Sequence, residues 1–251
     1  MTAAGGRTYF ITGTDTDVGK TVATAWLASA LAPGRRVALV KPVQTGARDP
    51  AVDGDEGFFR RALGVLAAGV TFATLESLPE PLAPSIAAAR AGRRVDLDSL
   101  AARCREIAAA HDLTLVEGAG GLLVTLDETP GAGADMADLA AALDAPLVVV
   151  IRPLLGTLNH TMLTVEAAER RGLSVELLIC SGYPDVPSVV ERENLRFLRR
   201  RYPQLPLLVL RRAALDGDEG LEALRPWLLG EPPALLRGLS LPDAPPGIAA
   251  G

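Results

Sequence analysis

The sequence predicts an α/β fold with a mainly parallel, doubly wound sheet flanked by helices. Short runs of Val, Leu and Ile recur along the chain without the in/out alternation of a half-exposed sheet, so their sheet is buried on both faces. Segments with helical periodicity separate these runs, as in βαβ units. The first apolar run leads into GTDTDVGKT (residues 13–21), a glycine-rich turn before a helix. This turn makes the predicted fold P-loop NTPase-like.

The elements are expected in the following order. Apolar runs predict strands at residues 7–12, 36–42, 70–72, 113–121, 145–152, 174–180 and 205–210, with a short extended segment at 122–126. Periodicity predicts helices at residues 19–32, 55–68, 85–91, 97–110, 135–144, 157–171, 187–201 and 219–229. Pro42 is expected to end the second strand, because proline lacks a backbone N–H. We expect one domain over residues 1–230 and a disordered tail over 231–251, which is rich in Pro, Gly and Ala.

Composition excludes several classes of protein. The 251 residues are 49% hydrophobic with a mean hydropathy of +0.24, which predicts a globular chain with a substantial core. A net charge of −5 and a pI of about 5.2 argue against nucleic-acid binding, which needs a basic face. We see no signal peptide and no membrane span of about 18 apolar residues. Cys104 and Cys180 match no metal-binding spacing, so we expect core thiols in a cytoplasmic protein.

Lysine is rare in this chain and its positions are informative. Among 25 basic residues only Lys20 and Lys41 are lysines, and the others are arginines. Each of the two follows an apolar run and lies beside a glycine or proline. Lysine supplies a compact, mobile charge where arginine supplies a planar fork. The placement therefore indicates two positions that need an ammonium group.

Polar and glycine-rich segments follow four of the predicted strands. They are residues 13–21, 41–45, 117–120 and 152–160. In open parallel sheets, ligands bind beyond the carboxyl ends of the strands. The sequence therefore predicts a ligand site where these segments converge on one edge of the sheet.

The first segment resembles a phosphate-binding loop of unusual length. Five residues separate Gly13 from Gly19, where the usual pattern has four, and residues 14–16 would form the crown of the loop. Backbone N–H groups and the positive helix end bind phosphate without needing a particular side chain at each position. Lys20 would reach the β- and γ-phosphates, and the Thr21 hydroxyl would ligate Mg²⁺. The alternative is an ordinary strand-to-helix turn.

Carboxylates and a second lysine follow the other strands. Glu117 ends a buried strand, where its charge is unfavourable unless a cation offsets it. Mg²⁺ is usually held by one or two carboxylates, with phosphate and water. Asp55 is a second candidate, although several residues of 49–56 are acidic and spacing alone does not choose among them. Lys41 could stabilise a phosphoryl group or a carboxylate, or it could form an ion pair at the rim.

Five segments occur together in an order that is typical of a known family. They are GTDTDVGKT (13–21), KPVQTG (41–46), EPLAPS (80–85), VEGAGG (116–121) and GTLNHTMLT (156–164). Over about residues 7–210 the chain resembles the dethiobiotin synthetase family, in which the longer phosphate loop is itself a feature. The resemblance implies a homodimer with the substrate site at the subunit interface. It also implies that 7,8-diaminononanoate, CO₂ and MgATP give dethiobiotin, ADP and phosphate.

The resemblance implies a mechanism in three steps. One amine captures CO₂ as a carbamate, and the carbamate oxygen attacks the γ-phosphate to give a carbamic–phosphoric anhydride. The second amine then closes the ureido ring and expels phosphate. For such chemistry the protein has mainly to position the reactants and to neutralise the charge on the phosphates.

The resemblance also implies roles for individual residues. The catalytic group is Lys20, Lys41 and Thr16. The metal ligands are Thr21, Asp55 and Glu117. The nucleotide contacts are Asp17, Val18, Gly19, Lys20, Thr21, Val22, Asp55, Glu117, Gly118, Ala119, Gly120, Ser181 and Gly182. The substrate contacts are Thr45, and Gly156, Thr157, Leu158 and Asn159 of the neighbouring subunit.

The chain departs from the family pattern at two places. Ser181-Gly182 stands where many members carry an Asn-Asp pair that reads adenine, so the choice of base is open. Ser85 stands where a histidine often follows EPxxP.

Other functions share some of these features. A partition-type P-loop ATPase switch uses a similar loop, but it typically has a lysine early in that loop, and residues 14–18 contain none. A cobyrinate-type amidating synthetase needs a glutaminase domain with a catalytic cysteine, for which this chain has no room. A third alternative is a nucleotide-binding regulatory module that catalyses no reaction. In the sequence, only Lys41 and Glu117 argue against it.

Overall fold

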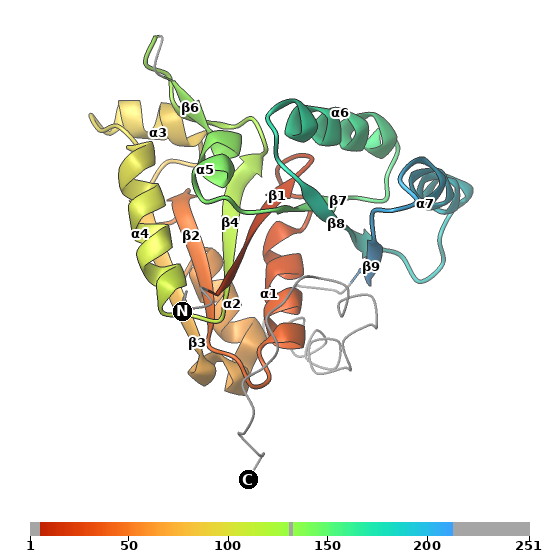
Figure 1. The fold of residues 1–251 in the computed structure, drawn as a ribbon, viewed down its shortest axis with the longest axis horizontal. Helices are drawn as coiled ribbons and strands as arrows, with labels where there is room; N and C mark the ends of the chain where they lie inside the picture. Colours follow the sequence, from red (N-terminus) through yellow and green to blue (C-terminus); the bar gives the residue numbers. More distant parts are fainter. Residues whose placement is uncertain (1–5, 131–132, 213–251) are drawn as a thin grey trace, which may run out of the picture.

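The computed structural model describes residues 6–130 and 133–212, which form a parallel sheet covered by helices (Figure 1). The sheet has seven strands in the order β3-β2-β4-β1-β7-β8-β9, and all of its pairings are parallel. The strands are β1 (Arg7–Gly13), β2 (Val37–Thr45), β3 (Val70–Leu78), β4 (Leu113–Gly121), β7 (Leu147–Ile151), β8 (Val175–Tyr183) and β9 (Leu207–Arg211). The predicted α/β architecture is confirmed.

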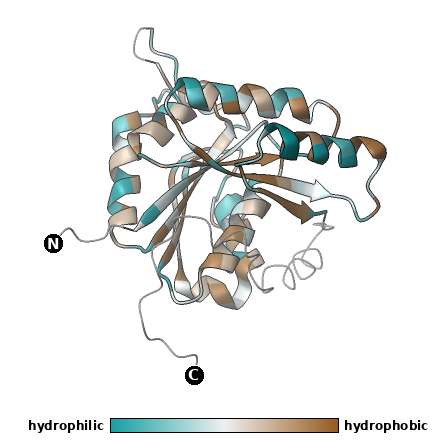
Figure 2. Ribbon diagram, turned by 45° about the vertical axis from the view of Figure 1, so that its right-hand side comes forward, coloured by the Kyte–Doolittle hydropathy of each residue, from teal (hydrophilic) through white to brown (hydrophobic). Residues whose placement is uncertain are grey.

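Helices cover both faces of this sheet. They are α1 (Lys20–Leu31), α2 (Asp55–Leu63), α3 (Pro84–Arg90), α4 (Leu97–Ala109), α5 (Met136–Ala142), α6 (Thr157–Arg170) and α7 (Val189–Arg201), with a 3₁₀ turn at Gly64–Gly69. Helices α1 and α2 pack into the core on one face, and α3 to α7 pack into the core on the other. Figure 2 shows brown, hydrophobic stretches along the strands, whereas the helices carry both brown and teal bands.

The burial of the strands explains why their sequences do not alternate. In β1, Tyr9 and Ile11 belong to the core on the side of α1, while Phe10 belongs to the core on the opposite side. All three are at most 1% exposed. A strand between two cores is therefore apolar at every position, which is the pattern that predicted the fold.

Three strands, β2, β3 and β8, extend three or more residues beyond their predicted ends. Pro42 does not end β2, which continues beside β3 through the pairs Val43–Glu76 and Thr45–Leu78. Pairing of β2 with β4 stops at Val40, so beyond it the strand has one neighbour, and a missing N–H can be accommodated on the open side. Strand β3 has nine residues, whereas three were predicted. It lies at the edge of the sheet and most of its side chains are only partly buried, so its sequence lacks the continuous apolar run that marks the inner strands.

The predicted extended segment at 122–126 overlaps a strand of a small second sheet, but its partner strand was not predicted. This sheet pairs β5 (Thr125–Asp127) with β6 (Ala134–Asp135) in antiparallel fashion. A strand of two residues carries too little pattern to be recognised from sequence. The predicted helix at 219–229 and the tail at 231–251 lie outside the described residues.

The two cysteines are core residues, as predicted. Cys104 on α4 and Cys180 on β8 are free thiols with 0% exposure. Burial raises the pKa of each thiol to about 12. Within residues 6–130 and 133–212, no helix is both long enough and apolar enough to cross a membrane.

Candidate active site

The loop between β1 and α1 forms the centre of the candidate site. Gly19 caps α1 with a left-handed φ of 90°, and a β-carbon built there would lie 2.4 Å from Ser181 Oγ. Glycine meets both the conformational and the steric demand. Among the described residues, no side chain caps this helix end. The positive end of the α1 dipole therefore faces the cavity that Gly19 lines.

A cavity of about 590 Å³ lies at the carboxyl ends of β1, β2 and β4. Most of the residues predicted for phosphate, metal and substrate contacts line it. They are Thr16, Asp17, Gly19, Lys20, Thr21, Val22, Lys41, Thr45, Asp55, Glu117, Ala119 and Gly120. The segments after β1, β2 and β4 therefore converge as predicted, while none of residues 152–160 lines this cavity.

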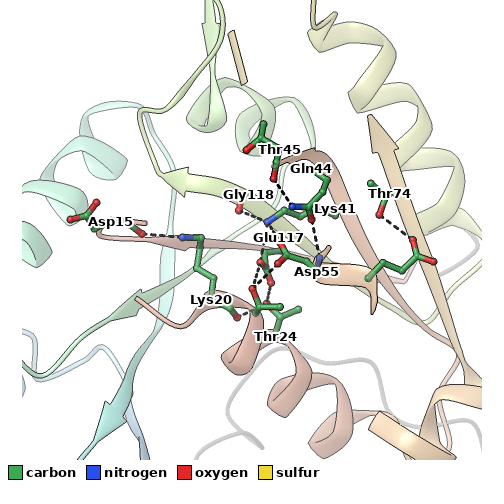
Figure 3. A network of polar contacts seen from close by, with 12 residues as sticks. Asp15, Lys20, Thr24, Lys41, Gln44, Thr45, Asp55, Thr74, Glu117 and Gly118 are labelled. Carbon is green, nitrogen blue, oxygen red and sulfur yellow. Dashed lines mark hydrogen bonds and ion pairs between the residues drawn. The ribbon is translucent and has the colours of Figure 1, made fainter. Parts of the chain in front are cut away.

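Five side chains form one polar network, and all but Thr24 line the cavity (Figure 3). Glu117 Oε1 accepts hydrogen bonds from Thr21 Oγ1 at 3.0 Å and from Lys41 Nζ at 3.1 Å. Glu117 Oε2 accepts one from Thr24 Oγ1 at 2.6 Å. Asp55 Oδ2 lies 2.5 Å from Lys41 Nζ, and Asp55 Oδ1 is 3.2 Å from Thr21 Oγ1. Two carboxylates, two hydroxyls and one ammonium group thus share one small volume.

Burial and charge act against each other on these groups. Burial raises the pKa of Glu117 above its usual value, although the charge of Lys41 opposes the shift. Burial alone would lower the pKa of Lys41, but the charges of Glu117 and Asp55 outweigh it and raise that pKa. Burial would raise the pKa of Asp55, but the charge of Lys41 outweighs it and lowers that pKa. At neutral pH, Lys41 and Asp55 therefore form a charged pair inside the site.

The other lysine faces the same cavity from the phosphate loop. Lys20 Nζ donates to the Asp15 carbonyl oxygen at 3.0 Å. Burial lowers the pKa of Lys20, while the charge of Glu117 opposes that shift. Lys20 and Lys41 are only 7% and 5% exposed. Both lysines of the chain are thus buried at one site.

The acidic loop before α2 directs one carboxylate into the cavity network. Asp53 accepts the backbone N–H groups of residues 48 and 49, and Asp49 accepts that of residue 51. Glu56 pairs with Arg60. Asp55, in contrast, faces Lys41 and Thr21. Asp53 also lines the cavity, but the contacts with Lys41 and Thr21 favour Asp55, which stays the predicted ligand.

The oxygen donors suit magnesium. Thr21 Oγ1 lies within 3.2 Å of a carboxylate oxygen of Asp55 and of one of Glu117, so one ion could reach all three groups. Mg²⁺ prefers such hard oxygens and usually keeps phosphate and water as its other ligands. Within the described part of the chain, no three His, Cys, Asp or Glu side chains gather as an all-protein metal site. The donor set therefore fits a metal that arrives with phosphate.

Sequence reasoning missed two residues that hold this network. Thr24 is fully buried, one helical turn after Thr21, and it binds the oxygen of Glu117 that Thr21 does not bind. Gln44 accepts the backbone N–H of Asp55 at 3.0 Å and donates to the Thr45 carbonyl oxygen at 2.9 Å, which ties the start of α2 to the end of β2. The i, i+3 spacing on α1 could have revealed Thr24. Gln44 belongs to the predicted site segment 41–45, but its role in holding Asp55 was not predicted.

A second cavity of about 290 Å³ adjoins the first across the phosphate loop. Asp17, Gly19 and Val22 line both cavities. The second is also lined by Val18, by Ser181 and Gly182 at the end of β8, by residues 152–154 after β7, and by residues 211 and 212 at β9. The predicted nucleotide contacts thus fall into two groups, one in each cavity. Gly118 lines neither cavity, but its carbonyl oxygen accepts a hydrogen bond from Lys41 Nζ at 3.2 Å.

The predicted substrate contacts at the start of α6 lie apart from both groups. Residues 156–159 line neither cavity in the part of the chain that the structure describes. Gly156 caps α6 with a φ of 91°, and the Thr157 N–H donates to the Leu154 carbonyl oxygen at 3.2 Å. Within one chain, the structure brings Thr45 to the main cavity, but not this helix start.

Known proteins match the chain over most of its length. A family model described as an AAA domain matches residues 7–209. The ATP-dependent dethiobiotin synthetase BioD of Rhodococcus erythropolis is 48% identical over 188 residues, covering 74% of this chain and 80% of that protein. BioD of Mycobacterium avium is 46% identical over 211 residues, covering 83% and 89%. The chain belongs to the dethiobiotin synthetase family. The expectation of an ATP-dependent ligase of this family is confirmed by these relatives.

Solved structures show how widely the fold of this synthetase is shared. The Cyanothece McdA(D38A)–ATP complex aligns with a TM-score of 0.54 at 14% identity, covering 96% of this chain and 93% of McdA. A nucleotide-binding protein from Archaeoglobus fulgidus in complex with ADP aligns with a TM-score of 0.50, also at 14% identity, covering 94% and 92%. Such low identity supports the fold alone, and the predicted P-loop α/β fold is confirmed.

Proposed function

We propose that this synthetase closes the ureido ring of dethiobiotin from 7,8-diaminononanoate and CO₂, with MgATP converted into ADP and phosphate. One observation carries the proposal. Both lysines of the chain lie on one cavity with the hydroxyl and carboxylates that suit magnesium, at the start of the phosphate-loop helix. The sequence similarity to dethiobiotin synthetases supports the same reaction.

In the proposed reaction the protein supplies charge and position. One substrate amine takes up CO₂ as a carbamate, whose oxygen attacks the γ-phosphorus and displaces ADP. The second amine attacks the carbonyl carbon of the resulting anhydride, the ring closes, and phosphate leaves. Lys20 and Lys41 oppose the negative charge that develops on the transferred group. Thr16 and Thr45, on the same cavity, would hold the carbamate and the amines.

Thr21, Asp55 and Glu117 would hold the magnesium ion in this proposal. When bound, Mg²⁺ neutralises charge on the β- and γ-phosphates. Thr24 and Gln44 keep the two carboxylates directed toward that position.

The nucleotide would extend over the phosphate loop from one cavity to the other. Residues 17–22 would bind the phosphates, with Glu117 and residues 118–120 beside them, and the base would lie over Ser181 and Gly182 in the smaller cavity. Ser181 has a single hydroxyl, which can donate and accept, and Gly182 has no side chain. We therefore propose that this end recognises the base loosely.

The start of α6 would serve a neighbouring subunit. In the described part of the chain, Gly156, Thr157, Leu158 and Asn159 line neither of the two cavities at the site, but a helix start without a capping side chain suits a carboxylate. In a homodimer, these residues would bind the carboxylate of diaminononanoate in the partner's site. A single domain over residues 1–230, a cytoplasmic location and the lack of nucleic-acid and membrane partners stay predictions.

A product assay tests the proposal directly. The full chain is incubated with diaminononanoate, ¹³C-bicarbonate and MgATP, and dethiobiotin is measured by mass spectrometry. We expect product that is one mass unit heavier than with unlabelled bicarbonate, formed together with ADP. Omitting diaminononanoate should remove the product. ATP hydrolysis without dethiobiotin would contradict the proposal and favour the partition-type switch.

A further inference from the structure

Asn194 on α7 holds a loop that reaches toward both ends of the candidate site. Its side chain lines neither cavity and is only 7% exposed. Asn194 Nδ2 donates to the Pro153 carbonyl oxygen at 2.9 Å and to the Leu154 carbonyl oxygen at 3.2 Å. A primary amide has two N–H groups, so it can satisfy two adjacent carbonyls at once. No aliphatic side chain can do this.

The loop held by Asn194 has two functions in the proposed enzyme. Residues 152–154 form one wall of the smaller cavity, where the base of the nucleotide would lie. Two residues later, Gly156 begins α6, which would bind the carboxylate of diaminononanoate. The Leu154 carbonyl oxygen accepts both Asn194 Nδ2 and the Thr157 N–H. A shift of this carbonyl would therefore move the cavity wall and the helix start together.

A second side-chain attachment of this loop, the ion pair of Arg152, is weak. Arg152 lies 3.6 Å from Asp15 of the phosphate loop, and the two side chains are 37% and 49% exposed. Exposed ion pairs of this kind contribute little to holding a geometry. Asn194 is buried beside Leu195 and Leu198 of the core, so its amide is held in place by packing. The buried amide is thus the more rigid of the two attachments.

We propose that Asn194 is a positioning residue that sets the base cavity and the start of α6 together. It would act on the binding of the nucleoside and of diaminononanoate, while leaving the phosphate loop unchanged. The inference rests on the proposed function, because that function gives the two ends of the loop their ligands. The hydrogen bonds of Asn194 support an effect that is confined to the base and the substrate. Within the described residues, its side chain binds Pro153 and Leu154 and makes no hydrogen bond to the phosphate loop at 13–21.

Two variants separate this role from a general loss of folding. Asn194→Leu removes both donors, and Asn194→Asp keeps the shape but places oxygen acceptors against the two carbonyls. Calorimetry should show that MgATP binds about tenfold more weakly to each variant, as expected for the loss of a buried hydrogen-bonded anchor. Magnesium tripolyphosphate, which lacks a base, should bind within about twofold of the unmodified protein. Glu193→Gln, at an exposed neighbour on α7, is the matched control and should change neither affinity.

Turnover gives an independent readout. The KM for diaminononanoate should rise in both variants, while kcat stays within a few-fold. Equal weakening of MgATP and magnesium tripolyphosphate would overturn the inference, as would unchanged MgATP binding in a folded variant. Circular dichroism identifies a variant that does not fold, and the remaining variant then decides the question.

The same data distinguish the two proposals. If the unmodified chain makes no dethiobiotin, the proposed function fails, and the contrast between MgATP and tripolyphosphate still tests Asn194 at the base cavity. If dethiobiotin forms and both variants bind MgATP normally, only the role of Asn194 fails.

Discussion

The two ends of the candidate site are built in different ways. At the phosphate end, Lys41 and Glu117 are 5% and 0% exposed and form a direct pair. Thr21 and Thr24 donate to Glu117, and Asp55 pairs with Lys41. At the base end, the smaller cavity is lined by loop residues and by the ends of β8 and β9. Its neighbouring ion pair, Arg211 with Asp185, has side chains that are 59% and 73% exposed.

This difference shows where substitutions can be tolerated. Removing one partner of a buried charged group leaves the others without compensation, so every residue at the phosphate end constrains the rest. The base end depends more on backbone position and on the shape of the cavity. We therefore expect changes at the phosphate end to abolish the reaction, and changes at the base end to adjust binding.

The largest expected effect comes from Lys41→Gln. Ring closure should fall by about 10²–10³-fold, because the variant loses a charge that opposes the one developing on the γ-phosphate. The buried Glu117 and the half-buried Asp55 would lose their cation, which lowers the free energy of unfolding by about 3–5 kcal/mol in the absence of magnesium. Dethiobiotin formation is followed by mass spectrometry, and unfolding by denaturant titration.

A matched control removes a positive charge from α2 instead. Arg60→Gln breaks an exposed pair with Glu56 and should leave turnover nearly unchanged. Near-normal ring closure in folded Lys41→Gln would remove Lys41 from the mechanism and weaken the contrast between the two ends.

A smaller effect is expected from Thr24→Val. This change keeps the shape of the side chain but leaves Glu117 Oε2 without its 2.6 Å hydrogen bond. Partners that orient a metal ligand typically change metal affinity 10- to 100-fold, so Mn²⁺ should bind about 10- to 100-fold more weakly in the presence of ADP. Electron paramagnetic resonance measures the free Mn²⁺.

Thr24→Ser restores the hydroxyl and should restore most of that Mn²⁺ affinity. If Val and Ser at this position bind Mn²⁺ equally well, the hydroxyl of Thr24 has no role in orienting Glu117.

At the base end, the expected effect is smaller still. The kcat/KM values for ATP and CTP should differ by less than about tenfold, because Ser181 and Gly182 offer few groups that distinguish the bases. Initial rates of dethiobiotin formation with each triphosphate give the ratio. A preference for ATP above about a hundredfold would show that the base end selects as strictly as the phosphate end.

The same contrast explains what could be predicted from the sequence. Lys20, Thr21 and Glu117 were predictable because a glycine-rich turn and buried strand ends place rare charged residues in recognisable positions. Asp55 needed the family resemblance, since its neighbours are also acidic. Gln44 and Asn194 were not predictable, because they act through backbone groups that lie next to them only in the folded chain. Pro42 did not mark the end of β2, because which of its neighbouring strands continues beside it is decided only in the folded sheet.

The cysteines provide the smallest and most local test. Cys180 immediately precedes Ser181 on β8 and pairs with Val209 of the edge strand β9, whereas Cys104 lies on α4. Both thiols are buried with a pKa of about 12, so in the folded protein at pH 8 each should react with a thiol reagent only after an opening motion. Cys180 also pairs with Ile151 of β7, so its labelling requires β8 itself to open.

Nucleotide should change these two rates unequally. A base bound over Ser181 stabilises the closed form of β8 and should slow the labelling of Cys180 a few-fold, while magnesium tripolyphosphate should not. The nucleotide should slow the labelling of Cys104 less than that of Cys180, since local opening of α4 need not disturb the base cavity. Mass spectrometry of Cys104→Ala and Cys180→Ala measures each thiol separately. Equal protection of both thiols by ATP would mean that they become exposed in one shared opening, and that the base end is as firmly held as the phosphate end.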